Sequence, residues 1–110
     1  MVGFLDCIYI FFKMIIQFSH SGDSLGTRFL GKALRLTFEN SIHEGENVVF
    51  DFSDVKTISH SFADECFGKL LLRWDLAELK SKTTFTNANE QVKKMIAFTW
   101  SERLSKSELV

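Results

Sequence analysis

Residues 47–79 constrain the fold more than any other part of the chain, because they join a strand of buried type to an amphipathic helix. Val48, Val49 and Phe50 follow one another without a polar residue between them, as is typical of a strand that is covered on both faces and lies centrally in a sheet. A polar turn at 53–57 follows, and apolar residues then recur at helical spacing over 62–79. A central strand that leads into a helix predicts an α/β fold.

Similar patterns predict further strands and helices on both sides of this segment. Strands are expected at 7–12, 14–18 and 82–88, and helices at 27–42, at 62–79 and from Asn87 or Asn89 onward. The predicted core-facing residues of the three helices are, in order, Leu30, Ala33, Leu34, Thr37 and Phe38; Ala63, Cys66, Phe67, Leu70, Leu71, Trp74 and Ala77; and Val92, Met95, Ile96, Thr99 and Trp100. The order β-β-α-β-α-β-α predicts three helices packed on a mixed, mostly parallel sheet of about four or five strands.

The start of the helix at 62–79 allows more detailed predictions. Ser61 fits the N-cap position, and Asp64 then lies at the third helical position, where a carboxylate completes a short capping box. Asp64 and Glu65 also complement the positive end of the helix dipole. Gly68 costs about 1 kcal/mol relative to Ala inside a helix, so we expect a neighbouring element to pack closely against it.

Length and charge narrow the class of protein. A chain of 110 residues with 45% hydrophobic residues fits one small domain with its own core. Thirteen basic and fourteen acidic residues give a formal net charge of -1, which offers no electrostatic reason to bind nucleic acid. Cys7 and Cys66 are isolated, and the three histidines show no metal-ligand spacing. We therefore expect two reduced thiols in a cytoplasmic protein, with no metal and no cofactor.

The N-terminus is strongly apolar but matches neither a membrane span nor a signal peptide. Asp6 and Lys13 interrupt the apolar residues of 1–18, and the remaining pieces are far shorter than the roughly 20 residues that a membrane helix needs. A signal peptide would carry positive charge first and small residues at a cleavage site. We expect 1–13 to be an extension or an edge strand through which an oligomer could form, 14–104 to be the domain, and 105–110 to belong to a polar end that frays from about 101.

Three sequence segments resemble the STAS-like domain of unknown function, a bacterial relative of the STAS domain (sulfate transporter and anti-sigma factor antagonist). They are TRFLGKALR at 27–35, VVFDFSDVKTIS at 48–59 and SFADECFGKLL at 61–71, and the resemblance covers about 14–100. It implies a STAS-like α/β fold and a role in signalling through protein–protein interaction. The partner that it implies is a kinase-like ATPase or an anti-sigma factor.

In anti-sigma factor antagonists of this fold, a serine just before the second helix is phosphorylated by such a partner. Matching the turns places His60 at that serine, with Ser59 before it, Ser61 after it and Phe62 at the position of the family's glycine. Ser59 and Ser61 are the remaining candidate phosphosites. Because the nearby carboxylates of Asp64 and Glu65 would repel a phosphate, we expect the domain to be a poor phosphoacceptor.

The predicted function is therefore non-enzymatic docking of a protein partner through His60, Ser61, Phe62 and Asp64. Two of these residues also have purely structural interpretations. Ser61 could serve only as the helix cap, and Phe62 could pack on Val55 or Ile58 instead of contacting a partner.

Other function classes remain open from the sequence. His60 and the nearby acids could belong to a small enzyme or a nucleotide-binding domain, although no nucleophile elbow or phosphate-loop spacing supports this. Arg28, which follows two glycines, could meet an acidic partner or a nucleotide phosphate. Asp51 is expected to accept backbone N–H bonds at the strand end rather than to form an acidic metal pair with Asp54. A self-associating structural module is the third class.

Overall fold

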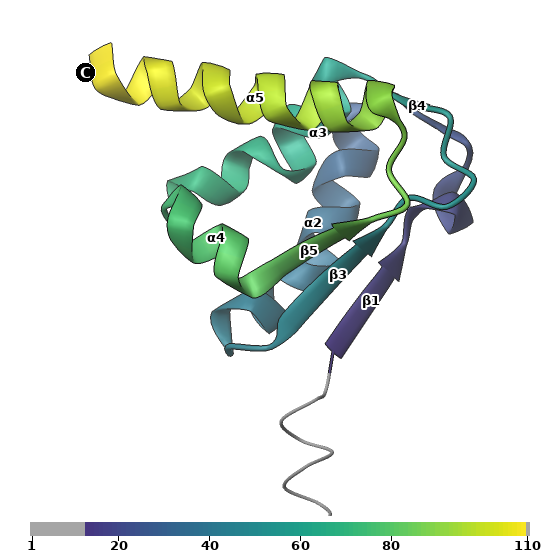
Figure 1. Cartoon of the computed structure of the whole chain (residues 1–110), viewed down its shortest axis with the longest axis horizontal. Helices are drawn as coiled ribbons and strands as arrows, with labels where there is room; N and C mark the ends of the chain where they lie inside the picture. The colour runs from purple at the N-terminus through teal and green to yellow at the C-terminus, as the bar shows by residue number, and fades with distance from the viewer. Residues whose placement is uncertain (1–12, 110) are drawn as a thin grey trace, which may run out of the picture.

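A parallel three-stranded sheet forms the centre of the fold (Figure 1). The computed structural model describes residues 13–109. β1 (Lys13–Gln17), β3 (Asn47–Asp51) and β5 (Thr83–Thr86) pair in the order β1-β3-β5, and both pairs are parallel. The prediction that the strand with three consecutive apolar residues is the central one is confirmed. The prediction that this strand is covered on both faces is wrong, because Val49 is only half-buried and its neighbour Ile15 is exposed. The predicted strand at 7–12 lies outside the described residues.

A second, two-stranded sheet lies at the carboxyl ends of these strands (Figure 1). β2 (Ser24–Leu25) and β4 (Thr57–Ile58) run parallel, with Leu25 opposite Ile58. β2 follows a short 3-10 turn, η1 (Phe18–Ser21). The predicted α/β fold is confirmed, but its five described strands are divided between two small sheets. β4 arises in the turn after β3, where the sequence pattern predicted no strand, and it pairs only with β2.

The first and last predicted helices are confirmed, and the last is longer than expected. α2 (Arg28–His43) begins after Thr27, whose hydroxyl accepts a bond from Leu30 N–H. α5 (Glu90–Leu109) is capped by the Asn89 side chain, which accepts from Val92 N–H at 2.9 Å. The expected fraying from 101 onward is wrong for the described residues. Side chains in this last part of α5 form ion pairs with α3, and these contacts stabilise the polar end of the helix.

The prediction of one helix over 62–79 is wrong, because the segment contains three short helices. They are α3 (His60–Cys66), the 3-10 helix η2 (Gly68–Leu72) and α4 (Leu76–Lys82). α3 ends at Cys66, and the close packing expected at Gly68 is present: a Cβ there would lie 2.7 Å from Asp64 Oδ1 and 3.0 Å from Thr99 Cγ2 of α5. Asp75 then starts α4 with a complete capping box to Glu78, which stabilises a new helix start.

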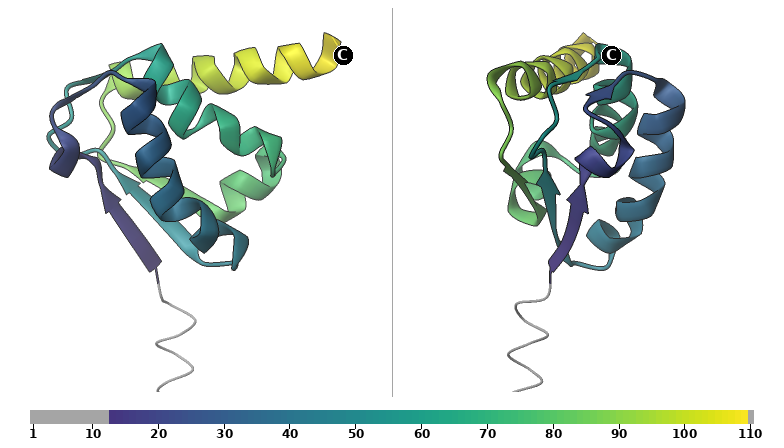
Figure 2. Two further views of the ribbon diagram at one scale, coloured as in Figure 1. Left: turned by 180° about the vertical axis from the view of Figure 1, so that it is seen from behind. Right: turned by 90° about the vertical axis from the view of Figure 1, so that its right-hand side faces the viewer.

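The core lies between the sheet and the helices on one of its faces (Figure 2). Alternate strand residues point into it, including the fully buried Val48 and Phe50. On the opposite face of the sheet, Ile15 is 60% exposed. The largest fully buried side chains are aromatic: Phe18, Phe38, Phe50, Phe52, Phe62 and Phe67. Within 13–109, no helix has both the length and the apolar character to cross a bilayer.

Candidate docking surface

Ser59, at the junction between β4 and α3, caps the helix. Its hydroxyl oxygen accepts a bond from Phe62 N–H at 3.0 Å, and its O–H donates to the carbonyl of Gly26 at 2.8 Å. Its own N–H donates to Leu25 O at 2.9 Å. The prediction that Ser61 caps the helix is therefore wrong, because the helix starts two residues earlier than the apolar spacing suggested. Ser61 instead lies half-exposed in the first turn.

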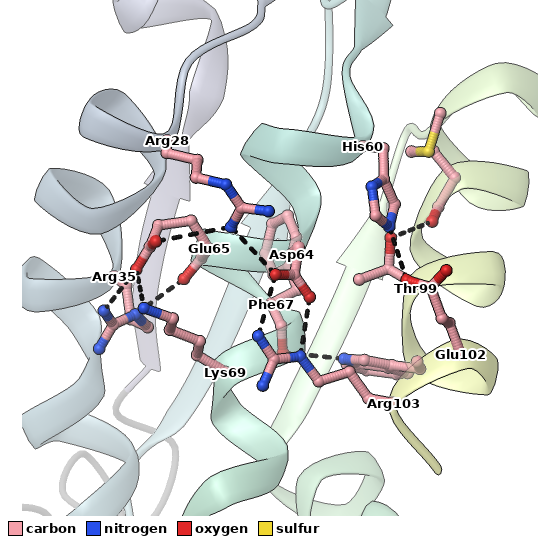
Figure 3. A network of polar contacts seen from close by, with 12 residues as sticks. Arg28, Arg35, His60, Asp64, Glu65, Phe67, Lys69, Thr99, Glu102 and Arg103 are labelled. Atoms are coloured by element: carbon pink, nitrogen blue, oxygen red, sulfur yellow. Dashed lines mark hydrogen bonds and ion pairs between the residues drawn. The ribbon is translucent and has the colours of Figure 1, made fainter. Parts of the chain in front are cut away.

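His60 lies half-exposed at the start of α3 and contacts α5. Its Nε2 is 2.9 Å from Glu102 Oε1 (Figure 3), and its ring packs against that of Phe98 with centroids 5.6 Å apart. Phe98 remains 56% exposed. An aromatic ring, an imidazole and a carboxylate thus lie together at the surface, which is a composition that protein interfaces favour.

Phe62 is fully buried, so the interpretation in which it contacts a partner is wrong. It packs edge-to-face against Phe18 and Phe67 in the core. The cause is the phase of the helix. Because Ser59 is the cap, Phe62 faces the sheet in the first turn, while His60 and Ser61 stay at the surface.

Asp64 is also buried, in an ion-pair network that connects three helices (Figure 3). Arg103 of α5 donates to both of its oxygens, at 2.7 and 2.9 Å, and Arg28 of α2 donates to Oδ2 at 3.0 Å. The bonds from Arg103 lower the pKa of Asp64 to about 2, Arg28 contributes further, and burial opposes them. Asp64 is therefore a structural ion-pair partner and neither a capping-box residue nor an exposed contact.

The negative charge of Glu65 is also balanced by neighbouring cations. Arg35 and Lys69 each contact Glu65 Oε2 at 3.0 Å, and Arg28 lies 3.7 Å from its other oxygen. Burial alone would raise the pKa of Glu65, but the hydrogen bonds from Lys69 and Arg35 outweigh it and the pKa is lowered. Because cations compensate the charge of both carboxylates, repulsion by Asp64 and Glu65 no longer predicts poor phosphorylation of Ser59 or Ser61.

An open groove borders this network. It has a volume of about 780 Å³ and runs between α3, η2, α4 and α5. Among its lining residues are Arg28, His60, Leu71, Leu72, Leu76 and Glu102. Leu72 is 72% exposed, so the groove offers apolar side chains beside ionic ones. We use the term docking surface for His60, Ser61, Leu72, Phe98 and Glu102.

The remaining candidates have structural roles. Asp51 accepts bonds from the N–H and hydroxyl of Ser53 and from the amide of Asn87, as expected, and the Ser53 backbone bond is the main cause of its lowered pKa. Cys66 is buried and unpaired, and burial raises the pKa of its thiol. No cluster of three potential metal ligands occurs among the described residues.

Comparison with known proteins agrees with this fold. A family model described as a STAS-like domain of unknown function matches residues 30–93, which is more than half of the 110 residues. The chain belongs to this family of STAS-like domains. Neither the curated proteins nor the solved structures gave a significant match.

Sequence reasoning missed the residues that α5 contributes. Glu102 and Arg103 lie in a segment that was expected to fray, and each pairs with a residue about forty positions earlier. The spacing on α5 contained a usable signal, since Phe98 and Glu102 are four residues apart and therefore share a helix face.

Proposed function

We propose that this domain is a non-enzymatic regulatory module that binds a partner protein through the docking surface. The observation that carries the proposal is the half-exposed His60–Glu102 pair, which lies against the exposed ring of Phe98. Apolar side chains bordered by ionic groups are typical of a binding patch on an otherwise polar surface. The family resemblance favours a kinase-like ATPase or an anti-sigma factor as the partner.

Burial and existing bonds determine which residues can take part. His60 and Ser61 remain accessible to a partner. Phe62 and Asp64 cannot contact one, because both are buried. Of the two candidate phosphosites, Ser61 is the better one, since the Ser59 hydroxyl already serves as cap and donor. We place the domain in the cytoplasm, because its two isolated cysteines lack the spacing of a disulfide framework.

The proposal is tested by capture from the native cell followed by reconstitution with the purified captured protein. We expect the double variant His60→Ala/Phe98→Ser to raise the dissociation constant about tenfold or more, because a central aromatic contact is lost. The matched control is Ile15→Ser, which removes a similarly exposed apolar side chain from the open face of the sheet.

Equal binding of the wild type and the double variant would contradict the proposed surface. Far-UV circular dichroism and thermal unfolding of each variant would show that the fold is retained. Incubation of the reconstituted complex with ATP, for the wild type and for Ser61→Ala, would show whether Ser61 accepts a phosphoryl group.

A further inference from the structure

A second open cavity, of about 600 Å³, is lined by residues of α4, β5 and α5 and by Ala88. Its walls are mainly apolar and include Phe85, Ile96, Trp100 and Leu104. A volume in this range and a mainly apolar lining are typical of sites for small molecules. None of the five residues of the docking surface lines this cavity, although Leu76 and Leu104 line both the cavity and the groove beside the docking surface.

The aromatic part of the wall is held in place without a ligand. The rings of Phe85 and Trp100 pack edge-to-face with centroids 5.7 Å apart. The indole N–H of Trp100 donates to the carbonyl of Phe67 at 2.9 Å, which fixes the orientation of the ring. A ligand that enters this cavity therefore loses little affinity to ordering of the wall.

The charged residues at the cavity are of one sign. Lys80 and Lys93 contribute to the lining, and no carboxylate of residues 14–106 does. Lys93 Nζ lies 3.6 Å from Glu90 Oε1, but both side chains are more than half exposed, and such surface pairs are weak. No ion pair of Lys80 occurs with the side chains of residues 14–106. An anion at the rim would meet two ammonium groups that are little engaged elsewhere.

We propose that this cavity binds a small amphiphile, a free molecule with an apolar chain or ring and one anionic head group. The apolar part packs on Phe85, Ile96 and Trp100, and the head group lies at Lys80 and Lys93. The positive rim selects an anionic head, and burial of the apolar part supplies most of the affinity.

The test is a fluorescence titration of the full chain with decanoate, decyl phosphate and decanol. Trp100 lines the cavity and the chain has two tryptophans, so the Trp74→Phe background leaves Trp100 as the only tryptophan. We expect a saturable signal, with decanoate and decyl phosphate binding several-fold more tightly than decanol at low salt. This preference should shrink as salt screens the lysines. A difference between the two anions would identify the head group.

Three variants separate the contributions to binding. Lys80→Gln/Lys93→Gln should reduce the affinity for decanoate to that for decanol. Ala97→Phe adds a ring to a residue that lines the cavity and should abolish binding of all three compounds. Lys94→Gln is the matched control, because Lys94 is an exposed lysine of α5 outside the lining, and it should bind as the wild type does.

Several outcomes would overturn the proposal. They are the absence of a saturable signal, equal affinity of decanoate and decanol in the wild type, and unchanged binding in a folded Ala97→Phe variant. A dimer that Ala97→Phe abolishes would identify a second copy of the chain as the occupant. Binding that appears only in a full-length Phe11→Ser/Phe12→Ser variant would identify the chain's own apolar N-terminus as the occupant.

Discussion

Ser59 decides which side chains at the start of α3 reach the surface. Its hydroxyl accepts from Phe62 N–H and donates to Gly26 O, so it sets the first helical residue and joins the helix to the loop after β2. With this helix phase, Phe62 enters the core, while His60 and Ser61 remain at the surface. The position of this cap therefore determines that Phe62 is buried and that His60 and Ser61 are accessible.

We therefore expect Ser59→Ala to lower the free energy of unfolding by about 1 kcal/mol, the usual loss for an N-cap hydroxyl. Ser61→Ala should change it by less than about 0.5 kcal/mol, because Ser61 is not the cap. Urea denaturation of the two variants beside the wild type measures both values. A larger loss for Ser61→Ala than for Ser59→Ala would show that the cap is assigned wrongly.

At the scale of elements, the close approach of α2 and α3 positions the whole polar network. Gly31 is buried in α2, and a Cβ at this position would lie 2.8 Å from the backbone carbonyl oxygen of Phe62. The two helices can approach this closely only because residue 31 has no side chain. The approach allows Arg28 and Arg35 of α2 to reach the carboxylates of α3.

Gly31→Ala should consequently destabilise the domain by about 1–3 kcal/mol through overpacking. Ala is favoured over Gly by up to about 1 kcal/mol inside a helix, but the contact is with backbone, so relief requires movement of a whole helix. Gly26→Ala serves as control, since nothing lies within 4 Å of its added Cβ. Thermal unfolding compares the two, and an unchanged or raised Tm for Gly31→Ala would contradict the close approach.

At the scale of the whole molecule, Asp64 connects elements that are far apart in sequence. Its carboxylate accepts hydrogen bonds from Arg28 of α2 and Arg103 of α5, which are 36 and 39 residues away. The C-terminal part of α5 is polar and therefore gains little stability from apolar packing. The network therefore joins α5 to α2 through a single carboxylate of α3.

This network should make stability depend on pH in the acid range. The pKa of Asp64 is about 2 in the folded protein against 3.8 as its ordinary value, so the folded state favours the ionised form. The resulting contribution, about 2 kcal/mol, is present above pH 4 and is lost as the pH falls from about 4 through 2.

Measurement of the unfolding free energy of wild type and Asp64→Asn between pH 7 and pH 2 checks this. The variant should be less stable by about 2 kcal/mol at pH 7, and the difference should narrow toward pH 2. Asp51 and Glu65 also have lowered pKa values, but both are present in both proteins. A difference that stays constant with pH would show that Asp64 is not stabilised as the anion.

Much of the fold could be predicted because its signals are local. Three consecutive apolar residues predicted a central strand, Thr27 and Asn89 are at or beside the expected helix starts, and Gly68 was expected to pack closely, as it does. The single helix over 62–79 was wrong because periodicity continues across Gly68 and Asp75, although the backbone is interrupted between them.

By itself, the sequence determined the α/β class, the central strand, the amphipathic helices and the family, since strand burial, helix caps and periodicity involve residues that are close along the chain. Only the tertiary structure decided that Phe62 lies in the core, that His60 is partly exposed, and that cations balance the charges of Asp64 and Glu65 in α3. These outcomes depend on partners such as Gly26, Glu102 and Arg103, more than thirty residues away. Side-chain contacts at that separation arise only when the packed helices bring the residues together.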